Sequence, residues 1–496
     1  MTMYVQDIIY HGKENAIAMV EGEKRISYGE LQQVVKQYGN YLHEIGVKPG
    51  DHVGIFARNS AAFVYAYMAI VSLGAVAVPI NFQLSPREIA YVIQDAGIEH
   101  LLTYKSLALE EQLSVYDYKI AVQQHNVAEC YKSFTGEKST EIMPQAIAME
   151  PQQPCAIIYT SGTTGRPKGA VLSHKNILAN IQQTDQMLHS SSDDRVLCIL
   201  PMYHCFGWTL SALYPLYAGA TMVIMEAFSP KETVDIIRRE QITDLYVVPS
   251  ICAFLTKVAK PEDLSAVRIV VSGGTTLPLK VAQDFYAKFG VAIAEGYGLS
   301  EASPVVAVNP LDKVKVGSIG KILPGLQYKL LDNSGNQVPL GDAGELVVKG
   351  DNVMLGYWNL PEETSHTLQD GWLHTGDVAK ADDEGYLYIV DRIKDIIISM
   401  GENVYPREIE ELVYKYPGIS DAAVIGVEDK VRGHAGACYF VANEAVNVKE
   451  LKQYLRKNLA IYKVPREFHQ ISELPRTDTG KISKVKLLEL HKTMKG

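Results

Sequence analysis

One segment of the chain carries more chemical information than any other: Tyr159-Thr160-Ser161-Gly162-Thr163-Thr164-Gly165-Arg166-Pro167-Lys168-Gly169. It ends an apolar run, Cys155 to Tyr159, that predicts a buried strand. The glycines allow a tight turn with exposed N–H groups, the hydroxyls can donate to phosphate oxygens, and Lys168 adds positive charge. The segment therefore predicts a polyphosphate-binding loop. For a piece of only five residues, an ordinary polar surface loop would be the better explanation.

This loop differs from the Walker A motif, in which Gly-Lys is followed by Ser or Thr. None of the pairs Gly12-Lys13, Gly320-Lys321 and Gly480-Lys481 is followed by either residue. Another kind of nucleotide site is therefore expected.

Around the loop, from about Ile26 to Asn309, helical patterns alternate with short apolar runs such as Ile269-Val270-Val271. This alternation predicts βαβ units with mostly parallel sheets, and therefore an α/β fold. From Tyr328 to Ile389 short strands separated by Gly and Asp turns predict a β-rich subdomain. No internal repeat is visible.

The C-terminal part has a different pattern. Pro406 opens a helix with an apolar stripe at Ile409, Leu412 and Val413. Asn447 and Glu450 form a capping box for a second helix, which carries Val448, Leu451, Leu455 and Leu459 on one face. We expect a large domain at residues 1–393 and a small α+β domain at residues 394–496, divided in the polar stretch Asp391 to Asp395.

Composition narrows the class of protein. The 496 residues hold 57 acidic and 47 basic side chains, a formal net charge of −10 that disfavours nucleic acid as a partner. Six scattered cysteines without a CxxC pair, and an N-terminus without an export signal, favour a reducing cytoplasm. Ala61 to Ile80 is long and apolar, but Gly74 and Pro79 interrupt it, so we expect a buried helix and strand rather than a membrane span.

Further motifs lie along the chain in a recognisable order. They are Pro201-Met202-Tyr203-His204, Ser272-Gly273-Gly274, Glu295-Gly296-Tyr297-Gly298-Leu299-Ser300-Glu301, Gly371-Trp372-Leu373-His374-Thr375-Gly376-Asp377, Asp391-Arg392-Ile393-Lys394-Asp395, Gly401-Glu402-Asn403 and Pro475-Arg476-Thr477-Asp478-Thr479-Gly480-Lys481. With the loop, they resemble the adenylate-forming superfamily of acyl-CoA synthetases, adenylation domains and luciferases across essentially the whole chain. Fatty-acid:CoA ligases are the most similar members.

The resemblance implies an enzyme that uses ATP, Mg²⁺ and CoA, and that joins a carboxylic acid to CoA through an acyl-adenylate. It implies Lys481, Glu301 and His204 as catalytic residues, with Thr160 and Glu301 at the magnesium. The implied ATP and AMP site consists of Thr160, Ser161, Gly162, Thr163, Thr164, Gly165, Lys168, Gly274, Glu295, Gly296, Tyr297, Ser300, Asp377, Arg392 and Lys481. Charge supports this site, because a carboxylate and a phosphate repel each other until cations neutralise them.

The acid pocket is implied at His204, Phe206, Trp208, Gly273 and Gly298. These segments are apolar, with no permanent cation to pair a second carboxylate, so a monocarboxylic acid with an apolar body fits. We expect a medium- or long-chain fatty acid, with a cinnamate- or benzoate-type acid as the alternative. Trp208 resembles the gate of a fatty-acid tunnel, and core packing explains it equally well.

For the thioester step the resemblance implies a mobile C-terminal domain with its hinge at Lys394 and a channel for CoA at Gly401, Glu402 and Asn403. Met400 and His434 stand where relatives commonly have glycine and glutamate. Other readings are a stand-alone enzyme that loads a carrier protein, a kinase or ATPase, and a regulator that only binds nucleotide. A homodimer and peripheral membrane contact are left open.

Overall fold

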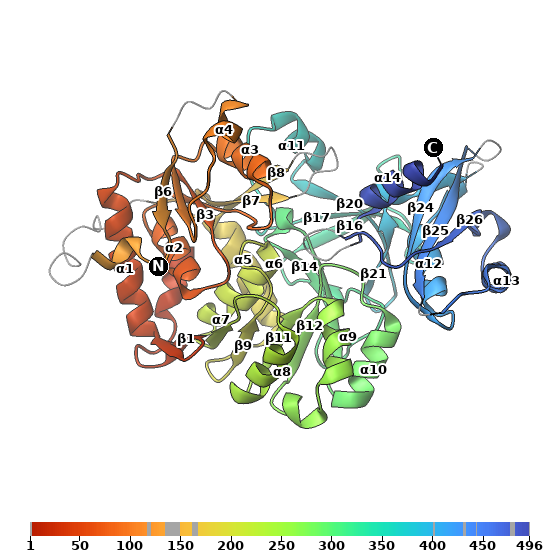
Figure 1. The fold of residues 1–496 in the computed structure, drawn as a ribbon, viewed down its shortest axis with the longest axis horizontal. Coiled ribbons are helices and arrows are strands. Elements are labelled where there is room, and N and C mark those ends of the chain that lie inside the picture. The colour runs from red at the N-terminus through yellow and green to blue at the C-terminus, as the bar shows by residue number, and fades with distance from the viewer. Residues whose placement is uncertain are drawn as a thin grey trace. The chain divides into compact units, whose positions relative to one another are not determined.

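The computed structural model describes residues 2–116, 121–133, 149–160, 167–399, 402–429, 433–442, 444–476 and 482–495. They form two compact units, one made of Met1–Gln327 with Val348–Leu373 and the other of Tyr328–Val347 with His374–Gly496. Each unit therefore combines segments that are distant in the sequence (Figure 1).

The first unit contains, among the described residues, a nine-stranded sheet in the order β15-β14-β13-β12-β11-β9-β10-β1-β2. The neighbours from β13 to β1 pair in parallel, and β2, β14 and β15 pair antiparallel at the ends. The strands are β1 (Ile17–Glu21), β2 (Lys24–Ser27), β9 (Arg195–Cys198), β10 (Thr221–Ile224), β11 (Asp244–Val247), β12 (Ile269–Ser272), β13 (Ile293–Gly298), β14 (Val305–Val308) and β15 (Lys321–Ile322).

Three helices connect the central strands and lie beside β11 and β12 in Figure 1: α8 (Pro230–Arg239), α9 (Pro249–Val258) and α10 (Leu279–Phe289). Ile236, Leu255 and Phe285, one from each helix, share a buried cluster with Leu245 and Val270 of the sheet. Strands covered by helices are apolar along their whole length, because both faces are buried. The short apolar runs in the sequence have this cause.

A second sheet of the first unit has seven strands among the described residues, in the order β18-β8-β7-β4-β3-β5-β6. The strands are β3 (His52–Phe56), β4 (Val76–Pro79), β5 (His100–Thr103), β6 (Gln123–Asn126), β7 (Pro154–Thr160), β8 (Lys168–Ser173) and β18 (Gly356–Tyr357). The helices α1 (Tyr28–Glu44), α2 (Ala61–Ser72), α3 (Pro86–Ala96), α4 (Glu110–Ser114), α5 (His174–Leu188), α6 (Cys205–Trp208), α7 (Tyr214–Tyr217) and α11 (Pro361–Thr367) complete the unit, with the short strand β19 (Leu368–Gln369).

The apolar stretch near residue 70 forms a buried helix and a buried strand, as expected. The Ser60 hydroxyl caps α2 by accepting from the Phe63 N–H, and the helix ends before Gly74, which has a φ of +67°. β4 follows, buried throughout. Among the described residues, helices long and apolar enough for a bilayer crossing are absent.

The second unit contains strands from two sheets. One has the order β16-β17-β20-β19, with β21 also paired to β20, and the other has the order β23-β22-β25-β24, with β26 paired to β25. The strands are β16 (Gln327–Leu331), β17 (Gly344–Lys349), β20 (Trp372–Ala381), β21 (Leu387–Arg392), β22 (Ile397–Ser399), β23 (Glu402–Val404), β24 (Ile419–Asp429), β25 (Gly433–Ala442) and β26 (Glu467–Gln470).

Its helices are α12 (Pro406–Tyr414), α13 (Val448–Asn458) and α14 (Lys484–Lys495). α12 and α13 bury Ile409 and Leu451 against one cluster of the sheet β23-β22-β25-β24, and α14 buries Leu487 in another. Asn447 caps α13 as expected, but Val448 is 37% exposed and does not belong to the buried face, because it lies in the first turn.

The compact units do not follow the expected division at residues 393 and 394, since residues 328–347 and 374–393 group with the C-terminal segment. The expectation concerned which part rotates during the reaction. That boundary therefore stays a prediction.

Candidate active site

The first unit brings several sequence motifs together at the carboxyl ends of parallel strands. His204 follows β9, Gly273 follows β12, and Gly296 lies in β13. A Cβ added to Gly273 would lie 3.3 Å from Cζ of Phe206 and 3.4 Å from the Gly296 carbonyl oxygen. These three motifs are therefore in direct contact, at the edge where open α/β sheets bind ligands.

Glycine is required at two positions of this edge. A Cβ on Gly298 would lie 2.2 Å from the carbonyl oxygen of Pro304, and Gly274 has a φ of +81°. Between them Glu295 is buried, and its Oε1 accepts from the N–H of Leu277. Asn309 donates to the backbone oxygen of Glu295 through its amide side chain at 3.0 Å. These two contacts fix the position of Glu295, two residues before Tyr297.

A second group of predicted residues gathers on adjacent strands of the seven-stranded sheet. Thr160 of β7 pairs with Lys168 of β8, and Tyr357 of β18 pairs with Ala170 of β8. Tyr357 donates its hydroxyl hydrogen to Oε1 of Glu301 at 2.7 Å. The Lys168 ammonium lies 5.5 Å from the centre of the Tyr357 ring and forms an ion pair with Glu363.

These contacts form one polar group, which we call the Lys168–Glu301 cluster: Lys168, Tyr357, Glu301 and Glu363. Burial, and then the Glu301 carboxylate, raise the pKa of Tyr357, so its phenol stays protonated and donates. The Glu301 carboxylate and the Thr160 hydroxyl offer the oxygen ligands that Mg²⁺ prefers. A lysine ammonium and a carboxylate held beside the same tyrosine suit the binding of a polyphosphate with its cation.

The segment after β9 begins a helix whose first residues were expected to line the acid pocket. His204 caps α6, its Nδ1 accepting from the N–H of Phe206 at 3.2 Å. Cys205 contacts the hydroxyl of Ser300, which the sequence assigned to the nucleotide site. His204 therefore caps a helix whose Phe206 lies beside Gly273 and whose Cys205 contacts Ser300.

Trp208 ends α6 and is 2% exposed. Its ring centre lies 4.5 Å from that of Tyr67 and 5.1 Å from that of Phe63, both on α2. A π-helical turn, η4 (Thr209–Leu213), follows directly. Aromatic packing alone accounts for Trp208, while π-helical turns occur often at functional sites.

In the second unit Asp377 is buried and paired with Arg392. Arg392 Nε lies 3.1 Å from Asp377 Oδ1, and the two residues face each other across β20 and β21. Glu345 fixes the approach to Asp377, because its carboxylate contacts Nδ1 of His374 and accepts from the N–H of Gly376. This arrangement positions a carboxylate that could accept from hydroxyl groups.

Lys394 lies in the short helix η7 (Ile393–Asp395) and is exposed. Glu402 and Asn403 lie in β23, also exposed, paired with Ser399 and Ile398. Some predicted residues lie outside the described part of the chain: Ser161, Gly162, Thr163, Thr164, Gly165, Gly401 and Lys481.

Comparisons with known proteins identify the family of the chain. The AMP-binding enzyme family matches residues 10–358, and the AMP-binding enzyme C-terminal domain matches residues 408–481. The chain belongs to the family of AMP-binding enzymes. The adenylate-forming superfamily expected from the sequence is confirmed, and so is the α/β architecture with a smaller C-terminal part.

Relatives and a solved structure cover nearly the whole of this AMP-binding enzyme. A feruloyl-CoA synthase from an Amycolatopsis species is 36% identical over 95% of both chains. A long-chain-fatty-acid–CoA ligase from Bacillus subtilis is 34% identical over 94% of this chain and 90% of its own. The crystal structure of ATP-bound MatB from Rhodopseudomonas palustris has a TM-score of 0.92 at 29% identity, with 100% of both chains covered.

Sequence reasoning missed Tyr357 and Glu363 of this AMP-binding enzyme. The available signal was weak, a tyrosine between Gly356 and Trp358 followed by acidic residues. Only the pairing of β18 with β8 brings Tyr357 beside Lys168. A contact of this kind depends on residues almost two hundred positions apart.

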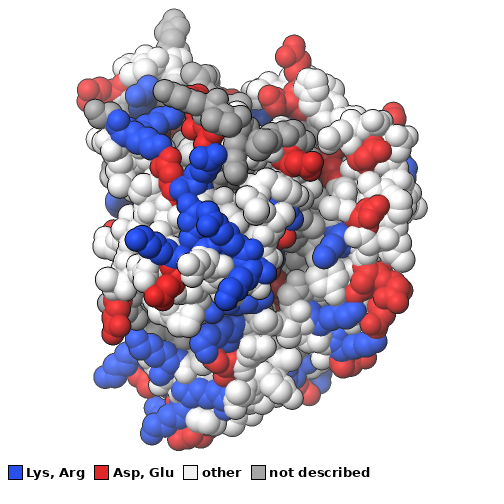
Figure 2. Space-filling model, turned by 90° about the vertical axis from the view of Figure 1, so that its right-hand side faces the viewer, with Lys and Arg blue, Asp and Glu red and all other residues white. Residues whose placement is uncertain are grey.

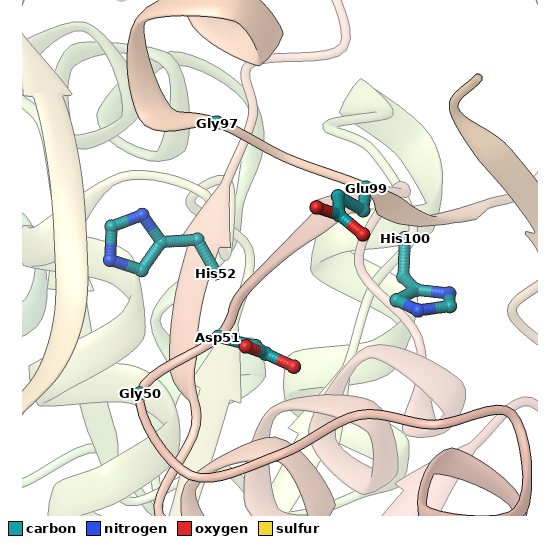
Figure 3. A pocket seen from close by; sticks show the side chains of 6 residues that line it. All are labelled: Gly50, Asp51, His52, Gly97, Glu99 and His100. Carbon is teal, nitrogen blue, oxygen red and sulfur yellow. The ribbon is translucent and has the colours of Figure 1, made fainter. Parts of the chain in front are cut away.

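A separate hollow of about 180 Å³ lies at the opposite ends of β3 and β5. It is lined by Gly50, Asp51, His52, Gly97, Glu99 and His100 (Figure 3). The His52 ring turns away from the two carboxylates, toward the Ala96 carbonyl and Trp358. Because the strands begin there, this hollow is not part of the ligand edge.

Basic side chains are unevenly distributed over the surface. Figure 2 shows a band of Lys and Arg side chains on the face that it displays, so the net charge of −10 is not spread evenly. All six cysteines are free thiols. Burial raises the pKa of Cys198 and of Cys252 to about 12, which keeps both protonated and unreactive at neutral pH.

Proposed function

We propose that this AMP-binding enzyme is an AMP-forming acid:CoA ligase that activates a monocarboxylic acid with an apolar body. The observation that carries the proposal is the Lys168–Glu301 cluster, because Lys168 belongs to the segment predicted to bind phosphate. The activities of the two curated relatives, both acid–CoA ligases by name, support it.

In the first step the acid carboxylate attacks the α-phosphate of ATP, and pyrophosphate leaves. Lys168 and the hydroxyl-rich segment bind the outgoing phosphates, and Lys481 offsets the negative charge between the carboxylate and the α-phosphate. Thr160 and Glu301 would hold Mg²⁺, which neutralises phosphate charge when bound. Tyr357 keeps the Glu301 carboxylate in place by donating to one of its oxygens.

The nucleoside requires an apolar face and an acceptor for hydroxyl groups. Tyr297 provides the face, with Gly274, Glu295 and Gly296 along the base. Asp377 accepts from the ribose, and Arg392 orients the Asp377 carboxylate. Ser300 is a further residue of the proposed nucleotide site.

In the second step the thiol of CoA attacks the acyl carbonyl, and AMP leaves. A rotation about Lys394 brings the segment Gly401, Glu402 and Asn403 to the reaction, where it forms the channel for CoA. Three residues of this region are exposed: Lys394, Glu402 and Asn403. Their exposure supports the proposal, because a segment that moves between two positions cannot be tightly packed in one of the two.

Two classes of carboxylic acid are candidate substrates. A medium- or long-chain fatty acid is our first candidate, since the π-helical turn after Trp208 marks a place where the indole could swing out and open a tunnel. An aryl acid is the second candidate. The tight packing of Trp208 against Phe63 and Tyr67 favours it, because a short, flat acid does not require the indole to move.

A CoA-dependent AMP-release assay over fatty and aryl acids tests the proposal. We expect AMP and pyrophosphate with one acid class, and no more than background release with Glu301→Gln. ADP as the product would favour a kinase or ATPase instead. AMP release that requires a carrier protein and ignores CoA would identify a loading enzyme.

Trp208→Ala separates the two acid classes. If the indole closes a tunnel, the variant accepts longer fatty acids, or accepts them faster, than the wild type. If the pocket is built for aryl acids, the variant loses activity on them and gains none on long chains. Trp372→Ala, which removes an indole near Lys349, is the matched control.

A further inference from the structure

A polar cluster in the second unit is used by neither proposed half-reaction. Glu467 and His469 lie two residues apart on β26, and His491 projects from α14. Alternation along a strand places residues i and i+2 on the same face. Two histidines and one carboxylate thus meet where the C-terminal helix packs on the sheet.

The three side chains aim ligand atoms at one point. His469 Nε2 lies 3.3 Å from Glu467 Oε2, and His491 Nε2 lies 3.9 Å from the same oxygen. The three atoms all lie within 4.8 Å of one another. Ligands about 2.0 to 2.2 Å from a tetrahedral zinc ion lie roughly 3.3 to 3.5 Å apart, so only small side-chain shifts are needed.

Neighbouring groups orient these ligands. Tyr439, paired with His469 across β25 and β26, has its hydroxyl 2.6 Å from Nδ1 of His491. When Nδ1–H donates to this hydroxyl, the Nε2 lone pair faces Glu467, which is the tautomer that a metal ligand requires. The Lys495 ammonium binds the other oxygen of Glu467, Oε1. Oε2 is the oxygen that faces the imidazoles.

The burial of these three side chains also favours a metal-binding site over an ordinary solvent-exposed polar cluster. The His491 side chain is 7% exposed, and those of His469 and Glu467 are 24% and 27% exposed. The rings of Tyr439 and His469 stack with centres 4.7 Å apart. The ligands are therefore largely preorganised, with one side open to solvent.

From this geometry we propose that Glu467, His469 and His491 bind Zn²⁺, with water as the fourth ligand. Two imidazoles and one carboxylate form a ligand set that suits Zn²⁺ rather than Mg²⁺ or Ca²⁺. The ion joins β26 to α14, the helix that begins three residues after Lys481. It stabilises the docking of this helix and takes no part in the chemistry.

The test uses the full-length protein, stripped with a chelator and titrated with Zn²⁺ against a chromophoric chelator, in excess Mg²⁺ so that oxygen sites are filled. We expect one zinc ion per chain, and with Co²⁺ the visible absorption of a tetrahedral site. His469→Gln and His491→Gln should abolish this binding. His43→Gln, an exposed histidine on α1, should retain it.

Tyr439→Phe distinguishes a metal site from a merely hydrogen-bonded cluster. It leaves all three ligands, and loss of such an orienting partner should weaken zinc affinity about 10- to 100-fold. Absence of stoichiometric zinc in the wild type would overturn the proposal, as would zinc that both histidine variants retain. If His491→Gln does not fold, His469→Gln and Tyr439→Phe decide the question.

Discussion

Two groups of candidate functional residues, one in each compact unit, are held in opposite ways. In the first unit Lys168, Tyr357 and Glu301 contact one another across strands that are far apart in the sequence. In the second unit Lys394, Glu402 and Asn403 are exposed on short elements. The difference teaches that groups proposed to act on a fixed nucleotide are preorganised, whereas groups proposed to act by moving are not packed into one arrangement.

The largest effect should come from a residue of the second unit that acts in only one step. Lys481→Ala should lower adenylate formation by about 10²- to 10³-fold, the usual result of removing one electrostatic stabiliser. Pyrophosphate–ATP exchange measures this step. Thioester formation from supplied acyl-AMP should change much less.

The matched control for this variant is Lys492→Ala, an exposed lysine on α14. It should leave both steps unchanged. Equal loss of both steps in Lys481→Ala would contradict the proposal that Lys481 acts in adenylate formation alone.

A buried histidine of the first unit, His174, should make the free energy of unfolding depend on pH. Burial lowers the pKa of His174 from 6.5 to about 4, and its Nδ1 accepts from the N–H of Val5. Between these pH values the unfolded chain binds a proton that the folded chain excludes. The free energy of unfolding therefore does not depend on His174 protonation above pH 6.5, and it falls by about 3 kcal/mol as the pH drops toward 4.

His174→Gln should flatten this part of the plot of unfolding free energy against pH, measured by urea unfolding of the full-length protein. His43→Gln, with an exposed imidazole, should keep the wild-type slope. An unchanged slope in His174→Gln would show that another group causes the pH dependence.

Loss of the hydrogen bond between Tyr357 and Glu301, which the sequence did not predict, should reduce activity by an intermediate amount. Tyr357→Phe removes the hydroxyl that donates to Glu301, and a hydrogen bond to a charged group contributes about 1.5 kcal/mol or more. We expect adenylate formation to fall about tenfold and its Mg²⁺ requirement to rise. Kinetics at varied Mg²⁺ measure both.

Tyr388→Phe is the control, because Tyr388 donates to the Asp382 carboxylate in the second unit. It should leave the Mg²⁺ requirement unchanged. A Tyr357→Phe variant with wild-type kinetics would mean that Glu301 needs no partner in the first unit.

The smallest effect should be a loss of several-fold in one step only. Lys394→Pro fixes φ at the proposed pivot and should slow thioester formation while adenylate formation continues. Single-turnover assays of the two steps separate them. A variant with both steps intact would move the pivot elsewhere and weaken the contrast between the units.

Much of the fold follows from local patterns. The apolar runs became the buried strands of parallel sheets, and Asn447 caps α13 where its capping box predicted. Val448 was expected on the same face as Leu451 and is 37% exposed, because periodicity locates a helix face but not the depth at which its first turn lies.

The sequence alone established the family, the α/β class and the order of the nucleotide motifs, since these depend on residue types at short spacing. Only the tertiary structure placed Tyr357 beside Lys168 and Glu301, and His491 beside Glu467 and His469. Such groups meet through strand pairing and helix packing between distant segments, and a linear pattern does not encode which distant side chains will share one space.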